Sequence, residues 1–385
     1  MIRREQLSPT WKKVLLRDAV EFLDYLRKPV TKIDRTDGEY PYYGANGQQG
    51  TIDDFIFDEP LVLLAEDGGN FGQEGRTVAY KVEGKCWVNN HAHVLRPKPN
   101  IDINFLLRHL EYYDVTPYIT GTTRGKLTKD AALRIELVLP PLPEQKRIAA
   151  ILDKADVIRR KRQQAVKLTE ELLRSVFLDM FGDPVTNPKG WEVKPLAEEI
   201  TFMTSGSRGW AEYYSDHGNK FIRIQNVKNG QLHFNDIQYV KAPDNKEAAR
   251  TKVQENDLLI SITADLGRTA VVDKQTADEG AHINQHLALV RLSNAINPHF
   301  VVAYLESQGG KRQFLQLDQA AVKSGLNFDS IKSLRIFNPP LVLQEQYAAA
   351  VESVENTKVK LKGAADTSDS LFTSLLQRAF RGELP

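Results

Sequence analysis

The 385-residue sequence contains an internal duplication, and this feature constrains the fold more than any other. Trp11 in "TWKKVLL" has a counterpart in Trp191 of "GWEVKPL", which separates the two copies by 191 − 11 = 180 residues. At the same separation, "YYGAN" (42–46) meets "IRIQN" (222–226). A chain with such a repeat is expected to fold as two similar units instead of one.

The separation between the copies grows along the chain. The segment "VNNHAHVLR" (88–96) matches "INQHLALVR" (283–291) at 283 − 88 = 195, and the tripeptide PPL recurs at 339 − 140 = 199. The growth places insertions in the second copy, chiefly between Gly230 and His286. Because the landmarks keep one order, we expect both copies to share one architecture.

Each copy consists of a mixed part followed by one long helix. In the mixed parts, short apolar runs such as "EPLVLLA" (59–65) and "NDLLISIT" (256–263) alternate with turn-forming residues, which is typical of β-strands. One amphipathic helix follows in each copy, at 104–113 and at 299–308. We therefore predict an α+β fold class, an internally duplicated chain with two mixed α/β domains, each followed by a long α-helix.

Both predicted long helices carry the spacing of a coiled-coil seam, with mostly apolar residues at alternating steps of three and four and weak positions at Arg162, Thr169 and Ser368. In the first copy the seam positions are Ile148, Ile151, Ala155, Ile158, Arg162, Ala165, Thr169, Leu172 and Val176. In the second they are Tyr347, Ala350, Val354, Thr357, Leu361, Ala364, Ser368, Leu371 and Leu375. At ~1.5 Å per residue each helix would be about 55 Å long. We expect the two helices to pair; in the alternative arrangement, each packs on its own globular part.

The charge and composition exclude several classes of protein. Basic and acidic residues number 51 and 50, so a DNA-binding surface would have to arise from local segregation of charge. Cys86 is the single cysteine, which excludes an internal disulfide, and the eight histidines lack a metal-ligand spacing. The polar start and the lack of a long apolar run predict neither a signal peptide nor a membrane span. We expect a cytoplasmic protein without a metal site.

No catalytic motif is complete in the sequence. The run "FNPPL" (337–341) resembles the Asn-Pro-Pro-aromatic box of amino-methyltransferases, but Leu341 replaces the ring that stacks on a flipped base. The glycine-rich run "AEDGGNFGQEG" (65–75) lacks the Lys-Ser/Thr ending of a phosphate-binding loop. The sequence therefore predicts no catalytic unit.

Polar, glycine-rich loops recur in both copies and are the candidates for DNA contacts. Asn and Gln can pair with adenine edges, Arg and Lys with guanine, and glycine allows close approach of the backbone. The candidates in the first copy are Tyr43, Asn46, Gln48, Gln49, Arg76, Thr122, Thr123, Arg124, Lys126 and Lys129. Those in the second copy are Arg208, Arg223, Gln225, Asn226, Lys228, Arg268, Lys323, Ser324 and Asn327. Each of these residues, taken alone, also fits an ordinary turn or surface position.

Some of these positions differ between the copies and others are shared. Tyr43 aligns with Arg223 and Gln48 with Lys228, so these positions are the first candidates for different base preferences. Asn46 aligns with Asn226, which also fits a shared role in the framework.

Two further features have two interpretations each. Asn89 and His91, with their counterparts Asn284 and His286, fit either a binding pair or a hydrogen-bonded framework. The run "RRKRQQAVK" (159–167) fits either a solvated helix face or a phosphate-contacting stripe.

The duplicated order of domains and helices resembles the specificity subunit of Type I restriction–modification enzymes over essentially the whole chain. The resemblance is strongest in "YPYYGANGQQGTID" (40–53), "GTTRGKLTKDAALRIELVLPPLPEQKRIAAILDKAD" (121–156) and "LLQRAFRGEL" (375–384). The second copy departs at "NPPLVLQEQYAAAVE" (338–352), where two extra residues follow PPL and the KR pair is absent.

The resemblance implies the organisation of the chain and its partners. Residues 1–142 and 184–341 would be target-recognition domains, each reading one half of a bipartite DNA site. Residues 143–183 and 342–385 would be antiparallel spacer helices that dock two methyltransferase subunits, and two motor–nuclease subunits would join for restriction. No cofactor would bind this chain; S-adenosylmethionine would belong to the methyltransferase, and ATP and Mg to the motor–nuclease.

We therefore predict a DNA sequence-recognition subunit without catalytic activity of its own. The alternative is a stand-alone bipartite DNA-binding regulator or a scaffold for another assembly.

Overall fold

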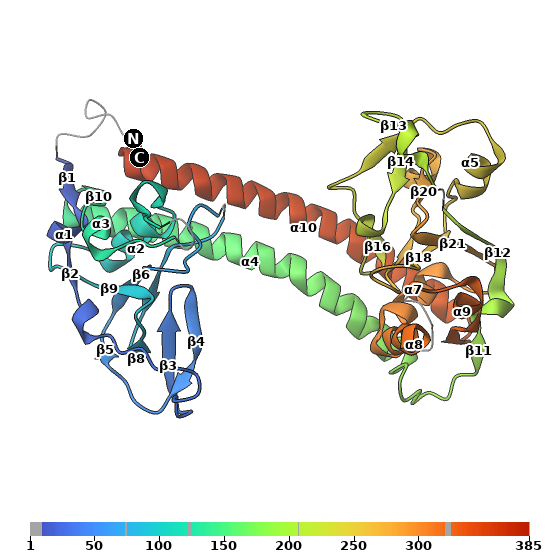
Figure 1. The fold of residues 1–385 in the computed structure, drawn as a ribbon, viewed down its shortest axis with the longest axis horizontal. Coiled ribbons are helices and arrows are strands. Elements are labelled where there is room, and N and C mark those ends of the chain that lie inside the picture. Colours follow the sequence, from blue (N-terminus) through green and yellow to red (C-terminus); the bar gives the residue numbers. More distant parts are fainter. Residues whose placement is uncertain (1–9, 74, 122–124, 207, 320–324, 385) are drawn as a thin grey trace. The chain divides into compact units, whose positions relative to one another are not determined.

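The computed structural model describes residues 10–73, 75–121, 125–206, 208–319 and 325–384. It divides into two compact units, Met1–Gln163 together with Gly363–Pro385, and Gln164–Lys362. Each unit holds one mixed domain and parts of both long helices, whose elements are labelled in Figure 1. In the described part of the chain, no helix combines the length and apolar character needed to cross a membrane.

The mixed domain of the first unit is built on two four-stranded sheets and one two-stranded sheet. The first four-stranded sheet is antiparallel, in the order β2 (Val20–Phe22), β9 (Ala92–Pro97), β6 (Leu61–Ala65) and β7 (Ala79–Val82). The second has the order β4 (Gly47–Ile52), β3 (Tyr40–Gly44), β8 (Lys85–Val88) and β5 (Phe57–Asp58), with β3 and β8 parallel. The two-stranded sheet pairs β1 (Lys12–Leu15) with β10 (Glu136–Leu139). The helices are α1 (Leu16–Ala19), α2 (Ile103–Glu111) and α3 (Lys129–Ala132), with 3₁₀ turns at Asp24–Leu26 and Thr116–Tyr118.

The mixed domain of the second unit repeats this plan with additions. Its antiparallel sheet has the order β12 (Ile200–Ser205), β21 (Leu287–Leu292), β18 (Leu258–Ser261) and β19 (Thr269–Val271). Its second sheet has the order β13 (Tyr214–Ser215), β17 (Gln238–Val240), β14 (Asn219–Ile222) and β20 (His282–Ile283), with β14 and β20 parallel. Two-stranded sheets pair β11 (Val193–Pro195) with β22 (Arg335–Phe337) and β15 (Val227–Lys228) with β16 (Gln231–Leu232).

The helices of the second mixed domain account for the insertions that the sequence requires. They are α5 (Lys246–Thr251), α6 (Lys274–Asp278), α7 (Pro298–Glu306), α8 (Gln308–Gln319) and α9 (Phe328–Ser333), with 3₁₀ turns at Leu196–Glu199, Trp210–Tyr213 and Ile224–Asn226. Helices α5 and α6 fall between Gly230 and His286, where the sequence places most of the extra residues. The predicted duplication is therefore confirmed, and the additions of the second domain include α5, α6 and the β15–β16 pair.

Strand register corrects one detail of the alignment. The parallel pairs join Tyr43 to Val88 in the first unit and Ile222 to Ile283 in the second. Because Val88 and Ile283 are counterparts, Tyr43 corresponds to Ile222 at 222 − 43 = 179, not to Arg223. The predicted equivalence of Tyr43 and Arg223 is therefore wrong by one residue, since sheet pairing fixes a register that loop similarity does not.

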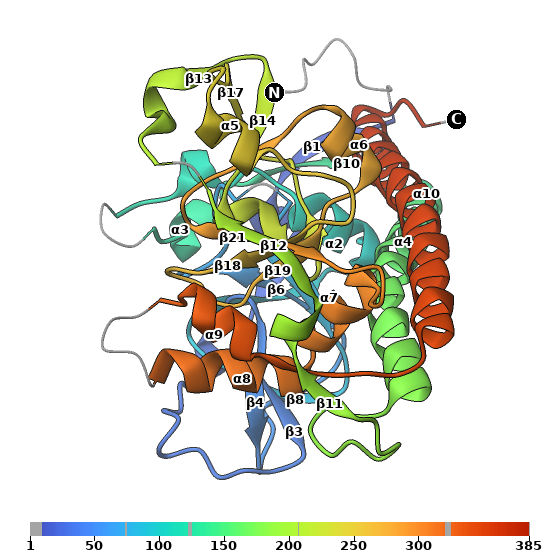
Figure 2. The same ribbon diagram turned by 90° about the vertical axis from the view of Figure 1, so that its right-hand side faces the viewer.

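The long helices α4 (Leu142–Phe181) and α10 (Leu341–Arg381) pack together, as predicted (Figures 1 and 2). In the first unit, Ile148 and Leu152 of α4 share a core with Trp11, Phe105 and Ala379. In the second unit, Phe177 and Phe181 of α4 pack on Phe300 and Tyr347. Within each unit, later residues of one helix meet earlier residues of the other, so the pair is antiparallel.

The predicted seam is only partly buried. Thr169 and Ser368 are buried, and the Arg162 guanidinium donates to the Ala364 carbonyl at 3.0 Å. By contrast, Leu172 and Leu371 are 50% and 56% exposed. The assignment of these two leucines to the helix–helix seam is therefore wrong, because a straight helix of 3.6 residues per turn drifts away from a strict seven-residue repeat.

An equivalent glutamine fixes the start of each long helix. Gln145 accepts from the Asp102 amide at 2.8 Å and donates to the Pro140 carbonyl at 2.9 Å. Gln344 accepts from the Asn297 amide at 2.9 Å and donates to the Pro339 carbonyl at 2.8 Å. The separation 344 − 145 equals 199, so the expectation of two extra residues after PPL in the second copy is wrong. The two helices begin with one shared geometry.

Candidate nucleic-acid interface

Two of the predicted contact residues of the β3–β4 hairpin, Asn46 and Gln49, line one cavity in the first unit. The Asn46 side chain donates to the Gly68 carbonyl at 2.8 Å, and Asn89 donates to the Gln49 side chain at 3.2 Å. The cavity has a volume of ≈ 350 Å³, and its lining includes Arg35, Tyr42, Asn46, Gln49, Asn89 and His91. Its lining thus combines amide donors and acceptors with one guanidinium and one tyrosine, a composition suited to a planar polar ligand.

Arg35 and Tyr42, two lining residues of this cavity, contact each other. The Arg35 guanidinium is 3.6 Å from the centre of the Tyr42 ring, and the Tyr42 hydroxyl donates to the Val30 carbonyl at 3.1 Å. Among the described residues, the Nε atom of Arg35 is buried without a hydrogen-bond partner. Sequence reasoning missed Arg35, which lies in a polar stretch before β3 with no motif of its own.

The other loop residues of the first copy lie outside this lining. Gln48 is exposed and donates to the Gly50 carbonyl at 3.1 Å, whereas the Tyr43 ring packs at 5.9 Å from Tyr80, where burial raises its pKa. Arg76 and Lys129 are exposed. Thr122, Thr123 and Arg124 lie outside the described residues.

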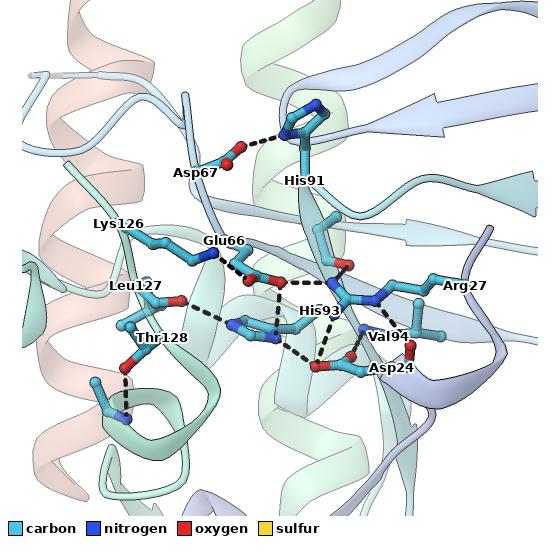
Figure 3. A network of polar contacts seen from close by, with 12 residues as sticks. Asp24, Arg27, Glu66, Asp67, His91, His93, Val94, Lys126, Leu127 and Thr128 are labelled. Atoms are coloured by element: carbon cyan, nitrogen blue, oxygen red, sulfur yellow. Dashed lines mark hydrogen bonds and ion pairs between the residues drawn. The ribbon is translucent and has the colours of Figure 1, made fainter. Parts of the chain in front are cut away.

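Lys126 is exposed, and its ammonium lies at the edge of an ionic network that includes the buried Glu66 and His93 (Figure 3). Its ammonium is 3.0 Å from Glu66, which also pairs with Arg27 at 2.6 Å. His93 uses both ring nitrogens, one 2.7 Å from Asp24 and the other 2.8 Å from the Leu127 carbonyl. Lys126 therefore has a structural role in holding the Leu127 segment on β6.

The same network contains a set of groups that resembles a metal site. Oxygen and nitrogen atoms of Asp24, Glu66 and His93 lie within 4.8 Å of one another. Burial acts to raise the pKa of Asp24 and of Glu66, but hydrogen bonds from His93 and Arg27 outweigh it and lower both values. Because Arg27 and Lys126 already neutralise the carboxylates, the donor set suits an ion-pair network better than a cation.

In the second unit, several predicted residues are held by partners within the domain. Arg223 and Gln225 both contact the exposed Asp236, at 3.3 and 2.6 Å. Asn226 is 1% exposed, and its amide donates to the carbonyls of His233 and Asp236. The interpretation of Asn226 as framework agrees with this burial.

The remaining candidates of the second copy differ in exposure. Arg208 and Lys228 are exposed, and Arg268 contacts Asp265 at 2.7 Å. Asn327 caps α9, because its side chain accepts from the Ser330 amide at 2.7 Å. Lys323 and Ser324 lie outside the described residues.

The pairs Asn89/His91 and Asn284/His286 show features of both a hydrogen-bonded framework and a binding pair. Asn89 accepts from the His91 amide at 2.8 Å, and Asn284 accepts from the His286 amide at 3.2 Å, so each asparagine belongs to the framework. The histidine rings, in contrast, are partly exposed. His91 contacts Asp67 beside the cavity, as Figure 3 shows, and His286 contacts Thr263 at 2.7 Å.

Comparisons with known proteins agree with this duplicated plan. A sequence profile described as "Type I restriction modification DNA specificity domain" matches residues 9–168 and 188–365. A Haemophilus influenzae protein, provisionally named a type I restriction enzyme specificity subunit, is 26% identical over 90% of this chain and 87% of its own length. The StySPI specificity subunit of Salmonella potsdam is 23% identical over 84% of this chain and 74% of its own length.

A solved structure shares the fold. The crystal structure of a Type I restriction–modification system S subunit from M. genitalium superposes with a TM-score of 0.62 at 14% identity, covering 97% of this chain and 98% of that one. At this identity the likeness concerns the fold alone. Since the two profile matches span most of the sequence, the chain belongs to the Type I restriction modification DNA specificity family, as a specificity subunit with two target-recognition domains.

Proposed function

We propose that each mixed domain reads one half of a bipartite DNA site, with residues 1–142 as the first recognition domain and 184–341 as the second. Specificity subunits are the non-catalytic members of their complexes, and the cofactors belong to the methyltransferase and restriction subunits. The observation that carries the proposal is that Asn89 and Asn284 make equivalent hydrogen bonds in the two domains, whereas the side chains of the surrounding loops differ between the domains. One framework with two sets of loop residues suits two half-sites of different sequence.

The exposed loop residues are the proposed DNA contacts. Arginine and lysine side chains supply phosphate and guanine contacts, while amides pair with base edges. In the first domain the accessible members of the predicted set are Asn46, Gln48, Gln49, Arg76, Lys126 and Lys129. In the second they are Arg208, Gln225 and Lys228, together with the partly exposed Arg223 and Arg268.

The helices 143–183 and 342–385 are the proposed docking elements for two methyltransferase subunits, and two motor–nuclease subunits would join the same complex in the cytoplasm. Support comes from Leu172 in the second unit and Leu371 in the first, which occupy equivalent positions (371 − 172 = 199) and are about half exposed. Exposed apolar side chains at matching positions suit two copies of one protein partner. A stand-alone regulator would have no use for them.

Purified chain supplied with S-adenosylmethionine and DNA should give no methylation until the methyltransferase subunit is added. Methylation by the chain alone, or failure of the complex to methylate a bipartite sequence, would contradict the proposal. The same preparations test the docking sites, because Leu172→Glu should leave a complex with one methyltransferase, as should Leu371→Glu.

The matched control for docking is Gln164→Glu, which adds the same charge at an exposed polar position of α4. Burial of one leucine contributes roughly 1.5–3 kcal/mol, so each leucine variant should lose methyltransferase affinity about tenfold or more, measured by native mass spectrometry and titration. Two bound methyltransferases at unchanged affinity in both leucine variants would place the docking site elsewhere.

A further inference from the structure

A histidine ring occupies the same position in both domains and is held in the same way. The Glu66 amide donates to the His91 carbonyl at 2.8 Å, and the Ile262 amide donates to the His286 carbonyl at 3.0 Å. The next residue along the chain then contacts the ring at Nδ1, Asp67 for His91 and Thr263 for His286. This polar pairing is thus a duplicated feature of the recognition domain.

The partner at Nδ1 determines what the opposite edge of the ring can do. An ionised Asp67 carboxylate accepts hydrogen bonds only, so the proton of a neutral His91 ring lies on Nδ1. Its Nε2 is then a hydrogen-bond acceptor, and no residue in the described part of the chain donates to it. In the second domain, the Gln285 side chain donates to Nε2 of His286 at 3.3 Å, which assigns the same tautomer.

The charges around His91 indicate which part of DNA this cavity accepts. Its lining holds one cationic side chain, Arg35, and one anionic side chain, Asp67, so their charges cancel. A phosphate group beside His91 would meet the Asp67 carboxylate and be repelled. The edge of a nucleobase is neutral and matches a lining of amide groups, an imidazole acceptor and a guanidinium.

We propose, resting on the DNA-recognition role above, that the cavity beside β3 and β4 receives a nucleobase edge and that His91 reads it through Nε2. In the major groove, an acceptor at this place selects a base that presents an amino group there, adenine or cytosine. Asp67 is a positioning residue that sets the tautomer of His91. At the equivalent place in the second domain both ring nitrogens of His286 are engaged, by Thr263 and by Gln285, so His286 is a positioning residue there and the base preference of that domain differs.

The experiment is methylome sequencing of cells that carry the full chain with its methyltransferase, for the natural chain and for His91→Gln, Asp67→Asn and His286→Gln. His91→Gln should relax one base position in one half of the motif by about tenfold or more in relative methylation, and leave the other half unchanged. Asp67→Asn should relax the same position, because its amide can also donate to Nδ1 and permit the other tautomer. His286→Gln should act on the opposite half.

The control is Glu83→Gln, which removes an exposed charge from the same domain and should keep the motif unchanged. Thermal melting of each purified complex identifies variants that fail to fold. If His91→Gln fails to fold, the base preference of Asp67→Asn, which keeps the His91 ring, tests the proposal instead. An unchanged motif in His91→Gln and Asp67→Asn would overturn the proposal. A uniform loss of methylation at every site, without a change in base preference, would also overturn it and indicate a phosphate contact. If the natural chain produced no bipartite motif, the DNA-recognition role itself would fail.

Discussion

At the scale of single residues, His109 on α2 is a buried titratable group of the first unit. Its ring centre lies 4.6 Å from that of Phe380 and 5.9 Å from that of Tyr113, and its Nε2 accepts from the Val138 amide at 3.2 Å. Burial lowers the pKa of His109 to about 4, because a charged imidazole would lose its hydration there. The ring is therefore neutral in the folded chain at neutral pH.

The depressed pKa of His109 predicts acid sensitivity. Between pH 6.5 and 4 the unfolded chain binds a proton that the folded chain does not, so stability falls as pH falls through this window. The loss should reach about 3 kcal/mol in the free energy of unfolding. His109→Gln, which keeps an acceptor for the Val138 amide, should remove this part of the pH dependence in urea unfolding at pH 7 and 4.5. His217→Gln, at an exposed histidine, should retain the natural dependence, and the same slope in both variants would refute the assignment.

At the scale of elements, an ion cluster joins α2 to α4 in the first unit. Arg108 is 8% exposed and contacts Glu111 at 2.7 Å, Asp153 at 2.8 Å and Asp156 at 3.1 Å. Burial raises the pKa of Glu111. Burial also acts to raise the pKa of Asp156, but the hydrogen bond from Arg159 and the charge of Arg108 outweigh it. In the second unit the position of Arg108 is occupied by Ala303 (303 − 108 = 195), and aromatic packing joins α7 to the helices instead.

Removal of Arg108 should therefore destabilise the first unit strongly. Arg108→Met keeps the aliphatic volume but leaves Glu111 buried without its main counter-charge and removes one of the arginines paired with Asp156, which should cost about 3–5 kcal/mol. Arg160→Ala is the matched control, because Arg160 pairs with Asp156 at 2.9 Å from a position that is 63% exposed, and its loss should cost at most about 1 kcal/mol. Urea unfolding of the purified chains measures both values. Equal losses of unfolding free energy in Arg108→Met and Arg160→Ala would mean that burial does not determine how much each arginine contributes.

At the scale of the whole molecule, each recognition domain is closed by its own ends. β1 at the start of the first domain pairs with β10 at its end, and β11 pairs with β22 in the same way. The chain therefore enters and leaves each domain next to the start of its long helix. This arrangement predicts that a recognition domain can be exchanged as a module.

Exchange of residues 1–140 for the first recognition domain of a relative should change one half of the methylated motif. The second domain and its loops are untouched by this exchange, so the other half should persist. Methylome sequencing of cells that carry the chimera and the methyltransferase provides the measurement. In the reciprocal control, residues 184–341 are replaced by the second recognition domain of a relative, and only the other half of the motif should change. A chimera that alters both halves would show that the two domains do not read independently.

The sequence by itself determined the features that repeat locally. The duplication, the Pro-Pro joints and the two uninterrupted helices follow from periodicity and from residues that end or permit a helix, so their prediction is confirmed. The loop candidates were predictable as a class, because Gly, Asn and Gln mark turns wherever they gather. None of this depended on which residues meet across the fold.

The tertiary structure alone decided the contacts between residues distant in the chain. The register that pairs Tyr43 with Val88, the contact of His91 with Asp67, the burial of Asn226 and the exposure of Leu172 and Leu371 all depend on how strands and helices pack. A short motif cannot specify these partners, because sheet pairing and helix drift are settled by the burial of many side chains together. For this reason the loops were predictable from the sequence, whereas the cavity and its histidine were not.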